Sequence, residues 1–112
     1  MIVFSGTLKG ENTMLKITKQ ADGSTLTVKV EGRVDSNTAV ELDRALNGAL
    51  DGITKLILDF ERLEYISTAG LRALLIAQKT MNQQGTIVIR NVSAAVKEIF
   101  EVTGFTDMLM IE

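Results

Sequence analysis

The stretch from Lys55 to Gly85 constrains the fold of this 112-residue chain more than any other. It begins with a nearly continuous apolar run, KLILDF, which is typical of a central strand covered on both faces. A short acidic loop follows, and Ser67 and Thr68 then open a run of apolar and small residues at helical spacing. A buried strand joined in this way to a helix indicates an α/β domain with crossover connections.

The flanking segments extend this pattern. Strands are predicted near 15–18, 26–31, 55–60 and 86–90, and helices near 38–50, 68–83 and 93–104. The order is therefore ββαβαβα, which predicts an α/β fold with a small mixed sheet of four to five strands and helices packed on it. We expect one domain over residues 14–112. Residues 1–13 are either an N-terminal extension or an edge strand.

Composition excludes several functional classes. The chain has no cysteine and no histidine, which removes disulfides, the usual zinc sites and histidine acid–base catalysis, and we expect no cofactor and no metal. The net charge is −2 and no run of five basic residues occurs, so direct nucleic-acid binding is not expected. No apolar run approaches the ~18 residues of a membrane span. The chain is predicted to be cytoplasmic.

Ser67 and Thr68 stand where a helix is predicted to begin, and two interpretations of them stay open. Either hydroxyl could cap the helix, as Ser and Thr commonly do. Alternatively, one of them could carry a phosphate, because the first N–H groups of a helix lack intrahelical partners and the helix dipole favours an anion there. Arg72, one turn further on, could bind a phosphate or a partner, or be an ordinary exposed arginine.

Two aspartates are candidates to join this hydroxyl pair. Asp35 and Asp59 follow predicted strands, and ligand crevices in α/β sheets form at the carboxyl ends of strands. Both also have structural interpretations. Asp59 could be a strand-end residue bonded to backbone. Thr38 and Glu41 form a possible capping box for the next helix, although Asp35 or Ser36 could be the cap instead. An enzyme interpretation lacks a base to activate a nucleophile and a glycine-rich phosphate loop, so no catalytic residue is assigned.

The segments LDFERLEYISTAGLRALL, VEGRVDSNTAVELDRAL and IFEVTGFTDMLMI resemble the STAS domain family. More narrowly, they are similar to the stand-alone bacterial anti-sigma factor antagonists. The resemblance covers about Met14 to Glu112, with the elements in the family's order. It implies a four-to-five-strand sheet flanked by helices and a switching role without catalysis.

The resemblance also implies partners and a modification site. An unphosphorylated antagonist of this family binds an anti-sigma factor that is also an ATP-dependent serine/threonine kinase, and so frees the sigma factor. The kinase then phosphorylates the antagonist, and a PP2C-like phosphatase resets it. The matching hydroxyl is Thr68, with Ser67 as a second candidate because the family's usual acidic residue is replaced there. The expected partner-binding residues are Asp35, Asp59, Ser67, Thr68, Ala69, Gly70 and Arg72.

Other functions stay open at this point. STAS domains also serve in anion transporters, which the lack of a membrane span disfavours, in stress-signalling complexes and as partners of lipid-transport ATPases. A small α/β hydrolase is the alternative from another class. The sigma factor, the kinase and the oligomeric state are not predicted.

Overall fold

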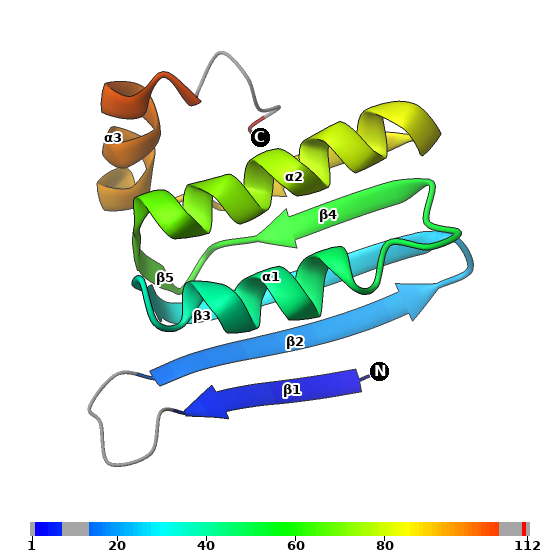
Figure 1. The fold of residues 1–112 in the computed structure, drawn as a ribbon, viewed down its shortest axis with the longest axis horizontal. Coiled ribbons are helices and arrows are strands. Elements are labelled where there is room, and N and C mark those ends of the chain that lie inside the picture. The colour runs from blue at the N-terminus through cyan, green and yellow to red at the C-terminus, as the bar shows by residue number, and fades with distance from the viewer. Residues whose placement is uncertain (1, 8–13, 106–110, 112) are drawn as a thin grey trace.

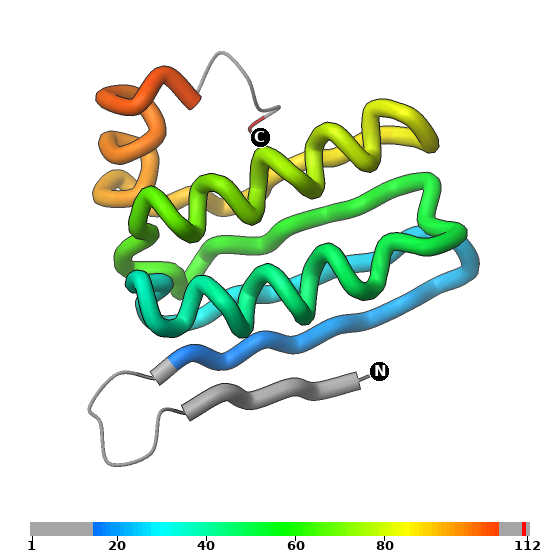
Figure 2. Tube along the Cα trace, in the orientation of Figure 1, coloured from blue at the N-terminus to red at the C-terminus, as the bar shows by residue number. Residues whose placement is uncertain are grey.

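The computed structural model describes residues 2–7, 14–105 and 111 (Figures 1 and 2). Its elements in chain order are β1 (Ile2–Thr7), β2 (Met14–Asp22), β3 (Thr25–Val34), α1 (Ala39–Asn47), β4 (Lys55–Asp59), β5 (Leu63–Ile66), α2 (Thr68–Gln84), β6 (Thr86–Arg90) and α3 (Ala94–Thr103).

The strands form one mixed sheet in the order β1-β2-β3-β4-β6. The pairs β1–β2 and β2–β3 are antiparallel, and β3–β4 and β4–β6 are parallel. Parallel neighbours need a crossover connection, and α1 and α2 supply these connections. The short strand β5 pairs in parallel with β3 beyond the end of β4, so that β4 and β5 follow one another along the same edge of β3.

The predicted α/β fold is confirmed, and the predicted order ββαβαβα matches the structure for the elements that it contains. The sheet nevertheless has six strands, whereas four to five were expected. One further strand is β1, an edge strand paired with β2, while residues 8–13 lie outside the described residues. The other is β5, which was predicted as part of a loop. It forms because Leu63 and Ile66 are both buried and its backbone pairs with β3.

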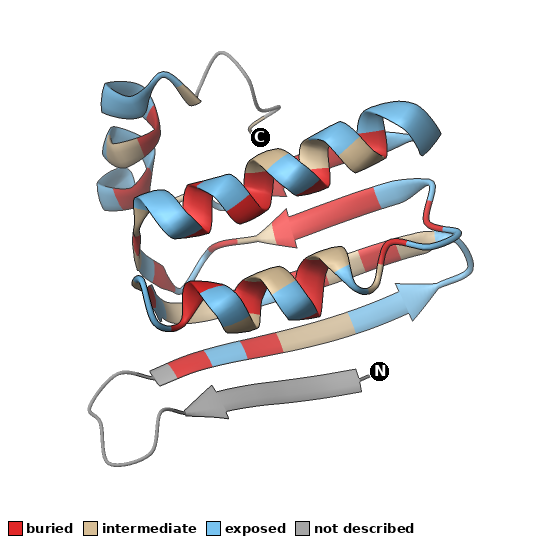
Figure 3. Cartoon of the chain, in the orientation of Figure 1, coloured by how far each residue is buried: buried red, intermediate tan, exposed pale blue. Residues whose placement is uncertain are grey.

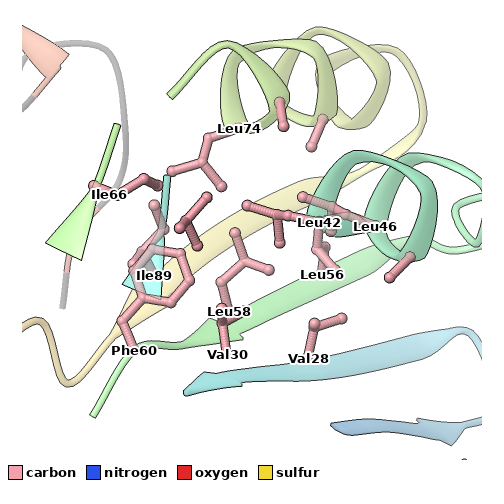
Figure 4. Close-up of a cluster of buried hydrophobic side chains, with 14 of the residues drawn as sticks. Val28, Val30, Leu42, Leu46, Leu56, Leu58, Phe60, Ile66, Leu74 and Ile89 are labelled. Carbon is pink, nitrogen blue, oxygen red and sulfur yellow. The ribbon is translucent and has the colours of Figure 1, made fainter. Parts of the chain in front are cut away.

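The main core lies between one face of the sheet and the helices (Figures 3 and 4). Alternate residues of the central strands point toward α1 and α2, which lie side by side over that face (Figure 1). The residues labelled in this core are Val28, Val30, Leu42, Leu46, Leu56, Leu58, Phe60, Ile66, Leu74 and Ile89. Such burial stabilises the domain by about 25 cal/mol per Å² of apolar surface removed from water, and it holds the starts of both helices against one end of the sheet.

Candidate functional site

The ends of β3 and β5 bring two distant parts of the chain together. Val34 and Ile66 are partners in the parallel register, and the Ser67 N–H donates to the Val34 carbonyl over 2.7 Å. Asp35 directly follows β3 and Ser67 directly follows β5, so both lie at the same end of the sheet. The structure therefore places Asp35 beside the start of α2, as the sequence suggested.

The two hydroxyls of the pair have different roles. Ser67 is the N-cap of α2, with an extended backbone (φ −84°, ψ 172°), and its Oγ accepts from the Gly70 N–H over 3.3 Å. Thr68 is the first residue of the helix and is exposed. Its hydroxyl makes no hydrogen bond with any residue that the structure describes. The predicted cap is thus Ser67, which leaves Thr68 available at the surface.

Gly70 allows α2 to begin close to the sheet. A Cβ at this position would lie 2.6 Å from Ile66 Cγ1 and 2.7 Å from Val34 Cγ1, closer than such atoms can approach. Gly70 is buried, whereas Ala69 is exposed next to Thr68. Ala69 is therefore accessible at the surface, whereas Gly70 lets the helix start lie against the sheet.

The loop after β3 is organised around Asp35. Its Oδ1 accepts from the N–H groups of Asn37 and Thr38, both at 2.9 Å. The fully buried Thr38 hydroxyl accepts from the Asp35 N–H at 2.9 Å and lies 3.0 Å from the Arg33 carbonyl, to which it donates. The capping box predicted for Thr38 and Glu41 is wrong, because the Thr38 side chain makes no cap hydrogen bond to α1. Thr38 is the N-cap residue of α1 by position, and the Asp35 carboxylate closes the turn before the helix by accepting from the Thr38 N–H.

These hydrogen bonds keep Asp35 ionised. The Thr38 backbone N–H is the largest cause that lowers the pKa of Asp35 from its ordinary value of 3.8, and partial burial opposes it. The Thr38 hydroxyl, the Asn37 N–H and the Arg33 guanidinium lower the pKa further. A fixed negative charge therefore stands beside the start of α2 at neutral pH.

Asp59 does not join this group. It is paired with Lys29 of β3, five residues before Val34, which corresponds to roughly 16 Å along the strand. Its Oδ1 accepts from the Glu61 N–H at 3.1 Å and from Asn91 Nδ2 at 3.2 Å. The suggested convergence of Asp59 with Asp35 and the hydroxyl pair is wrong, since β5 continues the sheet past the end of β4.

Two features of this end of the sheet were not predicted. The Thr38 hydroxyl network is one, and the other is the Arg33 guanidinium, which lies 4.7 Å from the centre of the Tyr65 ring. Arg33 and Tyr65 are register partners on β3 and β5. The contact between Arg33 and Tyr65 has no signal in the sequence because it depends on the pairing of β5 with β3. The Thr38 network is local to residues 33–38, and it forms because the Thr38 side chain is buried against that turn.

Within residues 2–7, 14–105 and 111, no group of three or more acidic, His or Cys side chains could hold a metal ion. No helix in the described part of the chain is long and apolar enough to cross a membrane.

Arg72 is exposed on the second turn of α2, four residues after Thr68. The site is therefore a surface formed by Asp35, Ser67, Thr68, Ala69 and Arg72, which we call the α2-start surface.

The chain belongs to the STAS domain family: residues 17–112 match the family model described as "Mlab, STAS domain". Among curated proteins it is 34% identical, over 99 residues, to a Bordetella bronchiseptica protein named as an anti-sigma factor antagonist, BtrV. That match covers 87% of this chain and 85% of the relative.

Solved structures agree on the fold. An anti-sigma factor antagonist from Mycobacterium paratuberculosis superimposes with a TM-score of 0.78 at 18% identity, covering 87% of this chain and 84% of the other. The antagonist SpoIIAA in its unphosphorylated form gives 0.74 at 19% identity, covering 86% and 87%. The phosphorylated form of SpoIIAA from Bacillus gives 0.67 at 18% identity, covering 86% and 90%. At these identities the comparisons bear on the fold alone.

Proposed function

We propose that this chain is an anti-sigma factor antagonist that binds its partner through the α2-start surface and is switched off by phosphorylation of Thr68. The unphosphorylated chain binds an anti-sigma factor with ATP-dependent serine/threonine kinase activity and so frees the sigma factor. A PP2C-like phosphatase removes the phosphate. The names of the relatives support the antagonist role.

The observation that carries the choice of Thr68 is the division of roles in the hydroxyl pair. Ser67 Oγ is engaged with the Gly70 N–H, so phosphorylating it would alter the hydrogen bond that caps α2. The Thr68 hydroxyl is exposed and is not needed for the fold. A kinase can therefore modify Thr68 without breaking a hydrogen bond that holds α2.

A phosphate at Thr68 would change the partner surface more than the fold. It adds about −1.5 to −2 charges at a helix start, where the dipole favours an anion by ~0.3–1 kcal/mol. A partner pressed onto the same surface would have to desolvate this charge next to the ionised Asp35. That could cost several kcal/mol, and each 1.4 kcal/mol is tenfold in affinity.

Several parts of the sequence interpretation belong to this proposal. The role is binding without catalysis, the location is cytoplasmic because the sigma factor acts there, and the domain extends from residue 14 to 112. Ser67 is kept as the second candidate acceptor. Asp59 is the weakest of the predicted partner-binding residues, because it lies apart from the α2-start surface.

The test is intact-mass spectrometry of the chain after incubation with ATP and each candidate anti-sigma factor kinase of the same organism. We expect one added phosphate that maps to Thr68, persists in Ser67→Ala and is absent from Thr68→Ala. A kinase that adds phosphate only to Ser67 would contradict the choice of acceptor. Tight binding of Thr68→Glu to the partner, equal to that of the unmodified chain, would contradict the switch.

The same preparation separates the alternatives. Stable binding to another complex with no phosphate added would favour a STAS subunit of a stress-signalling or lipid-transport assembly. Turnover of phosphate or acyl esters that is lost in Thr68→Ala or Asp59→Asn would favour a small hydrolase.

A further inference from the structure

The exposed side of α2 carries a row of three chemically distinct side chains. Thr68, Arg72 and Ile76 follow each other at intervals of four residues, which places them on one face of the helix. All three are exposed, and Ile76 is one of the few large apolar side chains in the described residues that keeps much of its surface in water, at 49%. The sequence of α2 contains no acidic residue.

Arg72 is placed to reach a group on Thr68. Residues four apart on a helix have Cβ atoms about 5–6 Å apart, and long helical side chains lean toward the N-terminus, here toward Thr68. Within the part of the chain that the structure describes, Arg72 forms no ion pair. The guanidinium is therefore not committed to an ion pair or a hydrogen bond with any of the described residues.

Resting on the function proposed above, we propose that the guanidinium of Arg72 changes its binding partner when Thr68 is phosphorylated. In the unmodified chain its guanidinium binds a carboxylate of the partner, while Ile76, one turn further on, contacts an apolar side chain there. When Thr68 carries a phosphate, Arg72 pairs with that phosphate through bidentate hydrogen bonds. Phosphorylation then removes an attractive contact in addition to introducing a repulsive charge.

The charge of the helix identifies the kind of partner. Its charged residues are Arg72 and Lys79, so its outer face is basic and partly apolar. A complementary surface is one with carboxylates around an apolar patch, because complementary potentials favour the correct encounter. A phosphate on Thr68 would repel the carboxylates of such a partner. It would also compete with those carboxylates for the guanidinium of Arg72.

The first experiment needs no partner. Phosphothreonine is incorporated at position 68 during synthesis of the full chain, and the second pKa of the phosphate is measured by ³¹P NMR titration. Pairing with Arg72 favours the dianion, so we expect Arg72→Gln to raise this pKa by at least about 0.2 unit. Lys79→Gln is the matched control, because it removes the same charge roughly 16 Å along the helix, beyond the Debye length of about 8 Å. Asp35 and Arg33 are unchanged in both variants, so their effects cancel. Equal pKa values in Arg72→Gln and Lys79→Gln would overturn the pairing.

The second experiment measures the affinity for the anti-sigma factor identified by phosphorylation. We expect Arg72→Gln to weaken binding of the unmodified chain by about fivefold or more, and Lys79→Gln to weaken it less. Phosphate at Thr68 should reduce the affinity of both the natural chain and Arg72→Gln. The fold-reduction in Arg72→Gln should be smaller than that in the natural chain by about fivefold or more. Equal factors would overturn the competition. If no kinase modifies Thr68, the proposed function fails. The NMR titration still decides whether Arg72 pairs with a phosphate at position 68, because it uses synthetic phosphothreonine and no kinase.

Discussion

Substitution of Gly70 by alanine tests how α2 is held against the sheet. The added methyl group would lie 2.6 Å from Ile66 Cγ1 and 2.7 Å from Val34 Cγ1. Both neighbours are buried, with 1% and 0% of their surface exposed, and both are β-branched, so that neither can rotate away cheaply. Overpacking of this kind costs about 1–3 kcal/mol, and the severity of the two contacts favours the upper half of that range.

Alanine also gains up to about 1 kcal/mol in helix propensity over glycine. The net expectation for Gly70→Ala is therefore a loss of about 1–2 kcal/mol in the free energy of unfolding, which lowers Tm by roughly 4–8 °C in a domain of this size. Urea unfolding, followed by circular dichroism, measures the loss. Ala69→Gly in the same turn is the control, because Ala69 is exposed and its substitution reports propensity alone.

A double-mutant cycle identifies the cause of the loss. Val34→Ala removes one of the two contacted atoms, so Gly70→Ala should cost less in that background than in the natural chain. A Gly70→Ala protein as stable as the natural one would refute the close approach of α2 to the sheet. Identical costs in the two backgrounds would refute the contact with Val34.

Substitutions at three further positions test the contacts around the α2-start surface and the far end of α2. Because the folded pKa of Asp35 lies below its ordinary value of 3.8, its contribution to stability is complete only above about pH 5. That contribution is lost as the pH falls through the lower folded pKa, and Asp35→Asn should flatten this part of a pH series of urea unfolding curves. Thr38→Val should cost about 1–3 kcal/mol in the same assay, because it leaves buried backbone groups unpaired, whereas Thr38→Ser should retain most of the stability. Gln84→Ala removes the Nε2 group that donates to the carbonyls of Leu50 (2.6 Å) and Ile53 (2.7 Å), and should lower Tm and speed amide exchange in that loop.

Local chemistry was predictable from the sequence. One hydroxyl of the Ser67–Thr68 pair was expected to cap a helix, and in the structure Ser67 accepts a hydrogen bond from the Gly70 N–H, three residues later. Ser93, where the third helix was predicted to begin, accepts from the Val96 N–H in the same way. N-cap chemistry depends on a few adjacent residues, so the sequence carries it directly. The strands β3, β4 and β6 were equally clear, because their apolar residues form alternating or continuous runs.

Contacts that depend on tertiary packing were not predictable. The strand β5 has only four residues, without a regular alternation of burial, and it forms because β3 extends beyond β4. The same extension separates Asp59 from Asp35, which sequence order alone cannot show. Thr38 matches a capping box by spacing, but burial directs its hydroxyl to the Asp35 N–H and the Arg33 carbonyl instead.

Because the cap and the exposed hydroxyl are separate residues, the proposed phosphorylation would change the surface of this domain without changing its fold. The hydrogen bond that stabilises the start of α2 belongs to Ser67, so a phosphate on Thr68 leaves that bond in place. The phosphate also meets a helix end that favours it by ~0.3–1 kcal/mol, a small term beside the 5–15 kcal/mol that typically holds a domain folded. Its large unfavourable effects arise only when a second surface excludes water from it. In the proposed switch, the unfavourable energy would therefore arise in the complex, and the free domain would keep the same structure with and without the phosphate.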